Sequence, residues 1–436
     1  EDPNLTDVVA ESYNRIVKTY DEIGIDGGWR EGAGYGFHTV HVAMYFADAL
    51  KRITNGEFNI FDHPKLETFA KFPLYISAPP NKSAKFGDSS AGRYSSATMS
   101  GKLALETGNN LWAWINKNWC GTPGDIFHII WAAHNVEPQL PSGTSHHFRK
   151  IDWITMRSDF SDPEKVTVIC KAGKNDDTHH GHLDVGQFMV YWRGVDYICD
   201  HGAAAYDEKF FDPEKYDTPQ ASSRGHNLIF VNGEQQISGS NYHEPIDENI
   251  GGEVLEFRPG KDRDYTLMDP TNAYPKKELK KWRRHIILEK PVITVVVDEV
   301  ESEKGAEIEA RFHSKCEQIV KDGYTLLHGK DGDIAMIPVI DGDFTFRPAG
   351  HAYQALQKNV RFQWIPYNGT VLHAPGNRTV IAHIILPVTG DSEARAIVNS
   401  AERSFDNTGN FILSFVKKGE MYRYMFKKEK DGLKFE

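Results

Sequence analysis

The chain has 436 residues, 40% of them hydrophobic and 12% aromatic, which is enough apolar material for two or three packed domains. The formal net charge is −11 and no run is rich in Lys or Arg, which argues against a nucleic-acid partner. The same balance argues weakly against a heavily sulfated ligand, although a local basic cleft can coexist with an acidic total. No stretch approaches the roughly 18 apolar residues of a membrane span, so we expect no membrane partner.

The ends and the cysteines limit the compartment only loosely. The first residues lack the basic and apolar regions of a leader, which fits a processed, a truncated or a cytosolic chain equally well. The four cysteines are scattered and form no CxxC pair. This pattern predicts free thiols, mostly buried, and neither a disulfide framework nor a thiolate metal site.

Residues 1–148 have the pattern of a helical domain. A helix is expected over residues 5–23, where Gly24 ends it. A second is expected over residues 37–50 and a third over residues 97–119, with a loop rich in Pro, Gly and Ser at 77–96. In the second helix the apolar residues recur at helical spacing: Phe37, Val40, Met44, Ala47 and Leu50.

Near residue 151 the pattern changes from helices to strands. Residues 166–170 form a β-branched run, residues 188–192 are apolar on both faces, and residues 292–297 are apolar at strand length. Turn pairs such as Asn232-Gly233 and Asp341-Gly342 punctuate the rest. We therefore predict an α+β, multidomain chain in which residues 149–436 form a large antiparallel β-sandwich that ends in a smaller β subdomain.

Histidines and carboxylates gather in three segments of the strand-rich part. His182 belongs to a His-rich run at residues 178–184, Asp200 follows a short apolar stretch, and His226 precedes an asparagine. Two imidazoles and one carboxylate suit zinc, and their long separations require ligands from neighbouring strands. A polar loop whose histidines only form hydrogen bonds is the alternative. If the run is extended, His180 and His182 point the same way, so that one could bind metal while the other faces a substrate cleft.

A Gly-rich loop at residues 26–36 leads into the second helix. It does not follow a strand in a GxGxxG pattern, so we reject a dinucleotide site. Arg30, Glu31 and Tyr35 lie where a helix begins, a position that favours anionic groups. On these grounds alone, Tyr35 is as compatible with packing as with catalysis.

In this order, the motifs resemble those of the heparinase II/III-like polysaccharide lyases, from about residue 20 to residue 240. The motifs are DGG-x-x-EG-x-x-Y ending at Tyr35, H-x-H-x-D-x-G beginning at His180, D-x-G at Asp200 and HN at His226. The resemblance implies an α/α toroid followed by an antiparallel β-sandwich, with the substrate cleft between them. It makes Tyr35 and His180 catalytic, and it makes His182, Asp200 and His226 the ligands of one structural divalent metal, usually zinc.

The chemistry implied is β-elimination on an acidic, uronate-containing polysaccharide. Tyr35 would protonate the leaving oxygen, and Tyr35 or His180 would take the C5 proton. Either Tyr206 or Tyr216 could serve as a second tyrosine. Arg30 and Glu31 would position substrate, and Trp119 would stack on a sugar ring, although a loop salt bridge and core packing are their simpler roles.

One departure concerns the N-terminal end. Family members carry an Asn or His upstream of the tyrosine loop, and here only Asn4 and Asn14 precede it. We therefore expect the toroid to be incomplete, the chain to be the C-terminal part of an enzyme, and the missing N-terminal part to be its partner. Among substrates, the acidic charge favours alginate over heparin, heparan sulfate or another glycosaminoglycan. A non-catalytic carbohydrate-binding protein and a zinc hydrolase are the rival functions, and the substrate class suggests a bacterial periplasmic or secreted location.

Overall fold

The computed structural model describes residues 3–80, 82–89, 96–120, 126–175, 180–204, 206, 210–239, 247, 249–353 and 363–436. The first residues of the His-rich run, Thr178 and His179, and part of the loop predicted at 77–96 lie outside this range. None of the helices within it is long and apolar enough to cross a membrane.

The N-terminal part is helical, as predicted. Its helices are α1 (Pro3–Asp21), α2 (Ala33–Ile53), α3 (Pro64–Phe69), α4 (Lys71–Tyr75), α5 (Ala97–Thr107), α6 (Asn110–Trp119) and α7 (Ile126–Ile130), with a short 3-10 helix η1 (Ile60–Asp62) and a small hairpin of β1 (Ser77–Ala78) and β2 (Lys82–Ser83). The first two predicted helices are confirmed. A single helix over 97–119 is wrong, because Gly108 adopts a left-handed φ of 68° and the Asn109 side chain accepts hydrogen bonds from the first backbone N–H groups of α6.

The rest of the described chain is dominated by antiparallel sheets. A five-stranded sheet contains β3 (His146–Phe148), β4 (Trp153–Arg157), β5 (Thr167–Lys171), β6 (Phe188–Trp192) and β7 (Val195–Ile198) in chain order. A four-stranded sheet has the order β17 (Phe344–Tyr353), β18 (Gln363–His373), β13 (Glu307–His313) and β8 (Ile229–Val231). The 3-10 helices η2 (Pro213–Asp217), η3 (Ser223–Gly225) and η4 (Thr271–Ala273) lie in the connections.

The largest sheet has eight strands. Their order is β14 (Glu317–Lys321), β15 (Tyr324–Gly329), β16 (Gly332–Val339), β19 (Arg378–Val388), β12 (Ile293–Glu301), β11 (Lys281–Glu289), β10 (Arg263–Asp269) and β9 (Glu253–Arg258). The chain ends with α8 (Asp391–Ser400) and a four-stranded sheet of β20 (Glu402–Phe405), β21 (Phe411–Lys417), β22 (Glu420–Glu429) and β23 (Gly432–Phe435). The three predicted strands are confirmed as β5, β6 and β12, and the domain limits stay a prediction.

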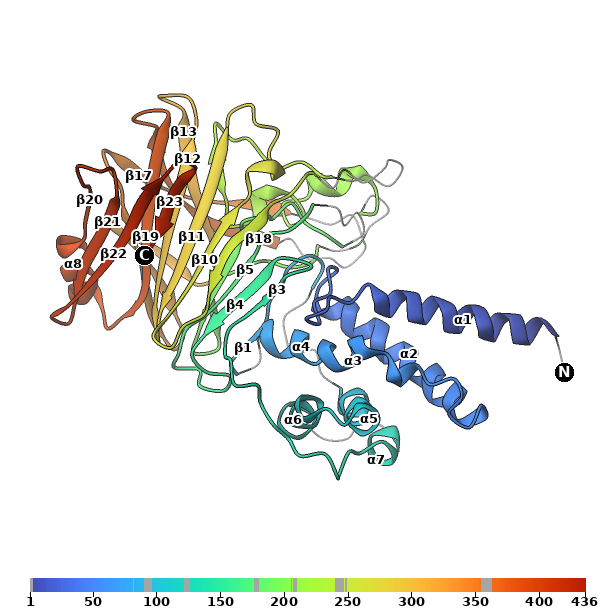
Figure 1. Cartoon of the computed structure of the whole chain (residues 1–436). Coiled ribbons are helices and arrows are strands. Elements are labelled where there is room, and N and C mark those ends of the chain that lie inside the picture. The colour runs from blue at the N-terminus through green and yellow to red at the C-terminus, as the bar shows by residue number, and fades with distance from the viewer. Residues whose placement is uncertain are drawn as a thin grey trace.

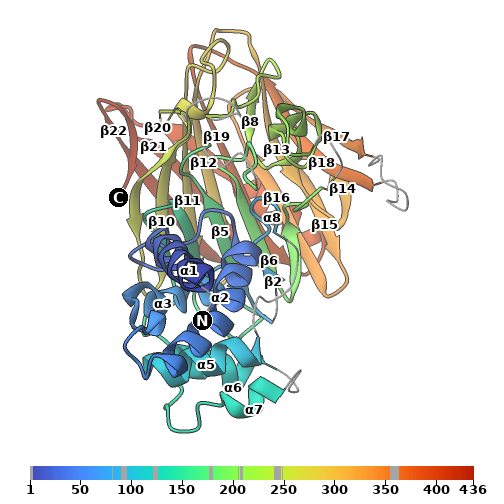
Figure 2. The same cartoon turned by 90° about the vertical axis from the view of Figure 1, so that its right-hand side faces the viewer.

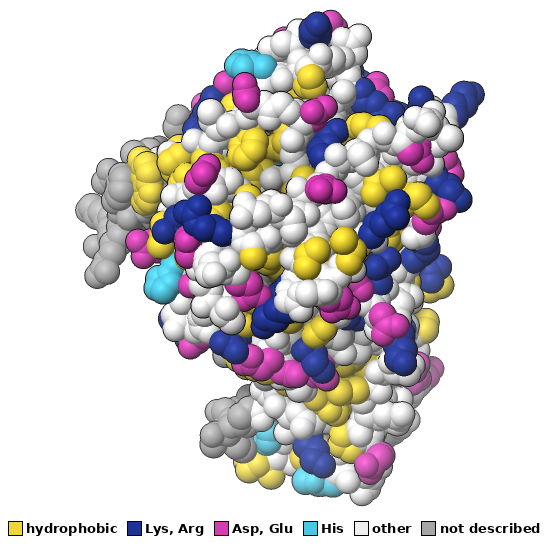
Figure 3. Space-filling model, turned by 90° about the vertical axis from the view of Figure 1, so that its left-hand side faces the viewer, with side chains coloured by type: hydrophobic (Ala, Val, Ile, Leu, Met, Phe, Trp, Pro, Cys, Tyr) yellow, Lys and Arg dark blue, Asp and Glu magenta, His cyan; other side chains and the backbone are white. Residues whose placement is uncertain are grey.

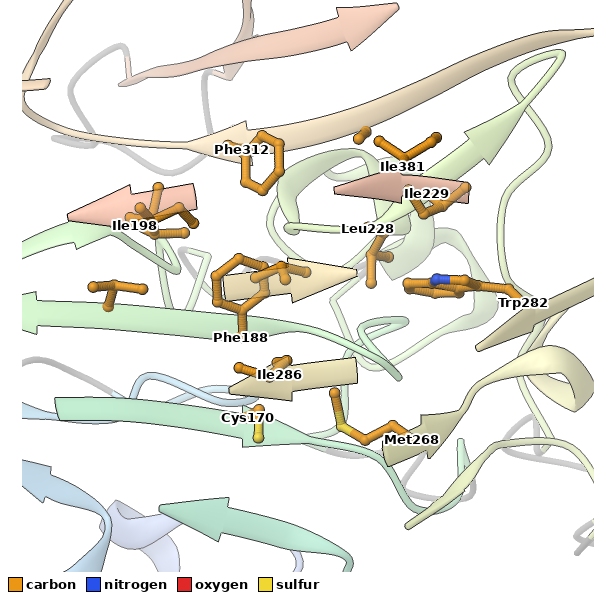
Figure 4. Close-up of a cluster of buried hydrophobic side chains, with 14 of the residues drawn as sticks. Cys170, Phe188, Ile198, Leu228, Ile229, Met268, Trp282, Ile286, Phe312 and Ile381 are labelled. Carbon is orange, nitrogen blue, oxygen red and sulfur yellow. The ribbon is translucent and has the colours of Figure 1, made fainter. Parts of the chain in front are cut away.

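Three apolar cores separate these layers. The first lies between the large sheet and the five-stranded and four-stranded sheets, and Phe188, Ile286 and Phe312 meet in it (Figure 4). The third lies between the other face of the large sheet and the C-terminal strands with α8. Figure 1 shows the resulting stack, with the C-terminal strands at one end and the helices at the other. On the C-terminal face, acidic and basic side chains are interspersed (Figure 3).

The second core joins the helical part to the five-stranded sheet. Trp153, Ile169 and Met189 of β4 to β6 pack into the same cluster as the helical residues Met44 and Trp112. Figure 2 shows α1 and α2 lying in front of these strands. This shared core holds the first turn of α2 close to the loops at the edge of the sheet.

Glu299 ties four strands of the C-terminal half together. Its carboxylate, on β12, accepts hydrogen bonds from His285 of β11 at 3.0 Å and from the backbone N–H of Leu433 on β23 at 2.9 Å, and it pairs with Arg378 of β19. Burial opposes ionisation, but these donors outweigh it and lower the pKa of Glu299 from 4.5 to about 2.

Glu299→Gln should therefore destabilise the fold in a pH-dependent way. A depressed carboxyl pKa stabilises the folded state above the ordinary value of 4.5, and this contribution is lost as the pH falls toward about 2. We expect the variant to lose about 3 kcal/mol of unfolding free energy at pH 7 and much less at pH 3, measured by urea unfolding. Glu301→Gln, on the same strand but exposed, should change little at either pH. An equal loss at both pH values for Glu299→Gln would contradict the assignment.

Candidate active site

Residues 85–89 form a narrow segment between the helical part and the loop after β5. Two glycines permit this close passage. A Cβ on Gly87, whose φ is +59°, would lie 2.3 Å from the carbonyl oxygen of His180, and one on Gly32, whose φ is +90°, would lie 2.3 Å from the Ser89 hydroxyl. The backbone N–H of Asp88 donates to the His180 carbonyl at 3.1 Å. Asp88 is thereby fixed beside the histidine loop.

The structure brings the two predicted catalytic side chains into contact. Tyr35 lies in the first turn of α2, and His180 lies in the loop between β5 and β6. Their rings stack with centroids 3.6 Å apart and an angle of 15° between the planes. His180 and His182 lie in a loop and not in an extended strand, yet both rings reach the same carboxylate.

That carboxylate is Asp88, which the sequence gave no reason to single out. One oxygen, Oδ2, lies 3.0 Å from Nδ1 of His180, and the other, Oδ1, lies 3.0 Å from Nε2 of His182. The Tyr206 hydroxyl donates to Oδ2 at 3.1 Å and lies 2.5 Å from the Tyr35 hydroxyl. The Asp88 side chain is itself fully buried. One buried carboxylate therefore links both histidines and both tyrosines.

The charges fix where the protons lie. Burial raises the pKa of Asp88, but the hydrogen bonds from His180 and His182 outweigh it, so that its pKa falls below the ordinary value. Burial, the hydrogen bond with Tyr35 and the charge of Asp88 raise the pKa of Tyr206 far above its ordinary value. Tyr206 therefore stays protonated and donates to Asp88, which leaves Tyr35 as the donor between the two hydroxyls. Because an ionised carboxylate only accepts, a neutral His180 carries its proton on Nδ1 and a lone pair on Nε2.

His182, Asp200 and His226 form one buried cluster, as predicted. Each offers a ligand atom within 4.8 Å of the others. Since a zinc–ligand bond is about 2 Å long, ligands of one ion lie at most about 4 Å apart, and the cluster would contract slightly to close around it. Nδ1 of His182 and both ring nitrogens of His226 are buried and have no hydrogen-bond partner. Buried nitrogens in this state are costly unless a cation binds them, so these residues fit a metal ion.

The surroundings of the cluster also suit a metal. Asp200 accepts from the backbone N–H of Gly202 at 2.7 Å and from the Gln187 side chain. Burial raises the pKa of Asp200, but the neighbouring His226 outweighs this and keeps it ionised. His182 directs Nε2 to Asp88 and turns Nδ1 to the cluster, which is the carboxylate–histidine arrangement that commonly supports a metal ligand.

A pocket adjoins the cluster on the other side of His182. Its lining includes His182, four cationic side chains and one carboxylate: Arg30, Lys150, Lys171, Lys174 and Glu22. Lys171 pairs with the buried Asp184 at 2.5 Å, and Lys150 with Glu22 at 3.3 Å. The pocket is therefore locally positive in a chain whose total charge is negative.

The other predicted binding residues are distributed more widely. Tyr216 lines the same pocket as Arg30, and its hydroxyl lies 3.3 Å from that of Ser238. Glu31 accepts a hydrogen bond from the indole of Trp29 at 3.0 Å, a contact within its own loop. Trp119 packs edge to face on Trp114, against the helical core. Tyr206 is thus the tyrosine that joins Tyr35, while roles for Glu31 and Trp119 in binding stay predictions.

Sequence reasoning missed Asp88, Gln187 and the pocket lysines. A glycine before a polar residue, as in Gly87-Asp88, was the only local signal for the first of them. Asn227, which follows His226, braces the loops by donating to the carbonyls of Phe188 at 2.8 Å and Cys199 at 3.0 Å. All four cysteines are free, as predicted, but only Cys170 and Cys199 are fully buried.

Comparison with known proteins agrees with this arrangement. The family model described as heparinase II/III-like, C-terminal, matches residues 140–400, and the chain therefore belongs to the heparinase II/III-like family. No curated protein sequence matches the chain.

Several solved structures share the fold. The heparinase III BT4657 gene product is 16% identical with a TM-score of 0.68, a crystal structure of heparinase III is 15% identical with 0.69, and the heparan sulfate lyase HepC from Pedobacter heparinus is 14% identical with 0.67. Each likeness covers 95% of this chain, and respectively 61%, 63% and 60% of those proteins. The chain thus spans less than two thirds of their length.

The cluster should bind one divalent ion per chain. His226→Ala should lower the affinity for Zn²⁺ by more than about 100-fold, because even changes beyond the ligands cost 10–100-fold. Isothermal titration with Zn²⁺ measures both the stoichiometry and the affinity. His383→Gln, which alters a fully buried histidine of β19, should leave both unchanged. Equal affinity in His226→Ala and the unaltered protein would rule the site out.

Proposed function

We propose that this protein is a polysaccharide lyase that cleaves a uronate-containing glycosaminoglycan, such as heparan sulfate, by β-elimination. The observation that carries the proposal is the stacking of Tyr35 on His180, with the protons of both rings ordered by Asp88 and Tyr206. Membership of the heparinase II/III-like family supports the reaction class.

The reaction needs a base, an acid and compensation of charge. The base takes the proton from C5 of the uronate, the bond from C4 to the leaving oxygen breaks, and that oxygen departs with the electron pair and is protonated. The product is a saccharide with a double bond between C4 and C5. Because the uronate carboxylate is already charged, positive groups must offset the charge that develops during proton removal.

The residues of the site match these needs. Nε2 of His180 carries the lone pair that would accept the C5 proton, and the Tyr35 hydroxyl would protonate the leaving oxygen. Tyr206, which keeps its proton, lies at the Tyr35 hydroxyl and orients it. For a sugar of the other configuration, Tyr35 would act as both base and acid. A bound metal, which we propose to be Zn²⁺, would hold His182, Asp200 and His226 in place as a structural ion.

The pocket favours a glycosaminoglycan over alginate. Our sequence-based preference for alginate depended on the total charge, which finds no support from the pocket, where cations outnumber carboxylates. Arg30 and Lys174 are exposed and suit a sulfate or carboxylate group of the substrate. The structures named for heparinase III and heparan sulfate lyase have the same fold.

The helices are proposed to belong to an incomplete α/α toroid, whose remaining helices would be supplied by further chain. We also propose a periplasmic or secreted location, because large acidic polysaccharides are met outside the cytoplasm. Both proposals depend on the substrate class.

A screen of polymers tests the reaction and the catalytic tyrosine together. Heparan sulfate, heparin, chondroitin sulfate, hyaluronan and alginate would each be incubated with the protein, and ultraviolet absorbance of the unsaturated product recorded. We expect heparan sulfate to react and Tyr35→Phe to lower kcat by about 100-fold or more, because a lost general acid costs this much. Tyr45→Phe, ten residues later on the same helix, should retain full rate.

The outcomes separate the rival functions. Binding of a polymer without any absorbance would indicate a non-catalytic carbohydrate-binding protein. Saturated products that vanish on chelation would indicate a zinc hydrolase. Full activity of Tyr35→Phe would remove Tyr35 from the mechanism.

The cationic pocket predicts a salt-sensitive KM. Lys174→Ala should raise KM by about fivefold at low ionic strength, which corresponds to about 1 kcal/mol for a partly exposed charge contact, with little change in kcat. The difference should shrink at high salt because exposed charges are screened. Steady-state kinetics at two salt concentrations measure this. Lys330→Ala, an exposed lysine between β15 and β16, is the matched control, and equal effects of the two variants would show that only total charge matters.

A further inference from the structure

Asp88 touches the candidate metal site and the candidate catalytic site at once. Its Oδ1 accepts from Nε2 of His182, whose other ring nitrogen faces the metal cluster, and its Oδ2 accepts from Nδ1 of His180. The side chains of Asp88 and His182 are fully buried, and that of His180 is 14% exposed. No water layer separates these groups, so a shift of one ring is passed to the other through a rigid carboxylate.

We propose that Asp88 is a positioning residue that couples metal binding to the orientation and tautomer of His180. With the carboxylate in place, His182 must present Nδ1 to the metal, and His180 must present Nε2 to the substrate. The catalytic half of this inference rests on the proposed lyase function, whereas the metal half does not.

The backbone around Asp88 supports a positioning role. Gly87 lets the chain approach the His180 carbonyl, and the N–H of Asp88 bonds to that same carbonyl. The side chain and the main chain of Asp88 therefore both hold His180. On the other side, Gly32 brings the start of α2 against Ser89, so that Tyr35 is positioned by the same short segment.

Asp88→Asn separates this role from simple packing. The amide keeps the volume but has only one accepting oxygen, so it cannot accept from both histidines. We expect a 10–100-fold loss of Zn²⁺ affinity, measured by competition with a chelator in the absence of substrate. With Zn²⁺ saturating, kcat should stay at least about 10-fold low while KM changes less than about threefold.

Two controls isolate the coupling. Asp264→Asn removes another buried carboxylate, which binds Ser145 and Lys290 away from this site, and should lower thermal stability without lowering Zn²⁺ affinity. His180→Ala should abolish turnover but leave Zn²⁺ affinity within about threefold. Unchanged Zn²⁺ affinity in Asp88→Asn, or full recovery of its kcat at saturating Zn²⁺, would overturn the proposal.

A measurement on the unaltered protein covers the case in which Asp88→Asn does not fold. Long-range ¹⁵N–¹H spectra of the zinc-loaded protein should show His180 with its proton on Nδ1, assigned by the signal that His180→Gln removes. A proton on Nε2 would overturn the proposal. If the protein turns over no polymer but both the affinity loss and this tautomer are observed, the lyase function fails and the role of Asp88 at the metal site stands.

Discussion

The packing of the helical part on the five-stranded sheet is the contact on which the site depends. Each part contributes half of the chemistry: Tyr35 comes from α2, and His180 from the loop between β5 and β6. Neither loop would hold its side chain to within an ångström alone. Because Trp153, Ile169 and Met189 share one core with the helices, the two halves are fixed relative to each other before any ligand binds.

Buried charge is the second theme of the molecule. Ionised groups lose much of their hydration when buried and persist only where partners replace it. Arg284 and Asp298 pair at 2.8 Å inside the β-sheets, and Lys171 and Asp184 pair near the pocket. At the candidate metal site this balance is incomplete within the protein, since nitrogens of His182 and His226 have no partner. That difference distinguishes a ligand site from a structural ion pair.

The electrostatics of the chain show why total charge is a poor guide to ligands. A net charge of −11 favoured an unsulfated substrate, yet Arg30, Lys150 and Lys174 meet at the pocket beside His182. These residues lie more than a hundred positions apart along the chain and converge only on folding. A ligand responds to the local field at the cleft, which total composition does not report.

The sequence by itself determined the elements whose signals are local. Apolar periodicity gave α2, β-branched and apolar runs gave β5 and β6, and the ordered motifs gave the three metal-ligand candidates and the Tyr35–His180 pair. Local signals failed where a residue acted against its type. Gly108 and Asn109 broke a helix that periodicity joined, and Asp298 and Glu299 extended β12 beyond its apolar run because they are paired with Arg284 and His285.

Tertiary structure alone decided which side chains meet. It selected Tyr206 over Tyr216 as the neighbour of Tyr35, and it placed Asp88 between two histidines more than ninety residues away. A lone aspartate in a polar loop carries no mark of burial, because its environment is made by segments distant in the chain. Sequence specifies the groups and their local geometry, whereas the charge, hydration and partners of each group arise only when the layers pack.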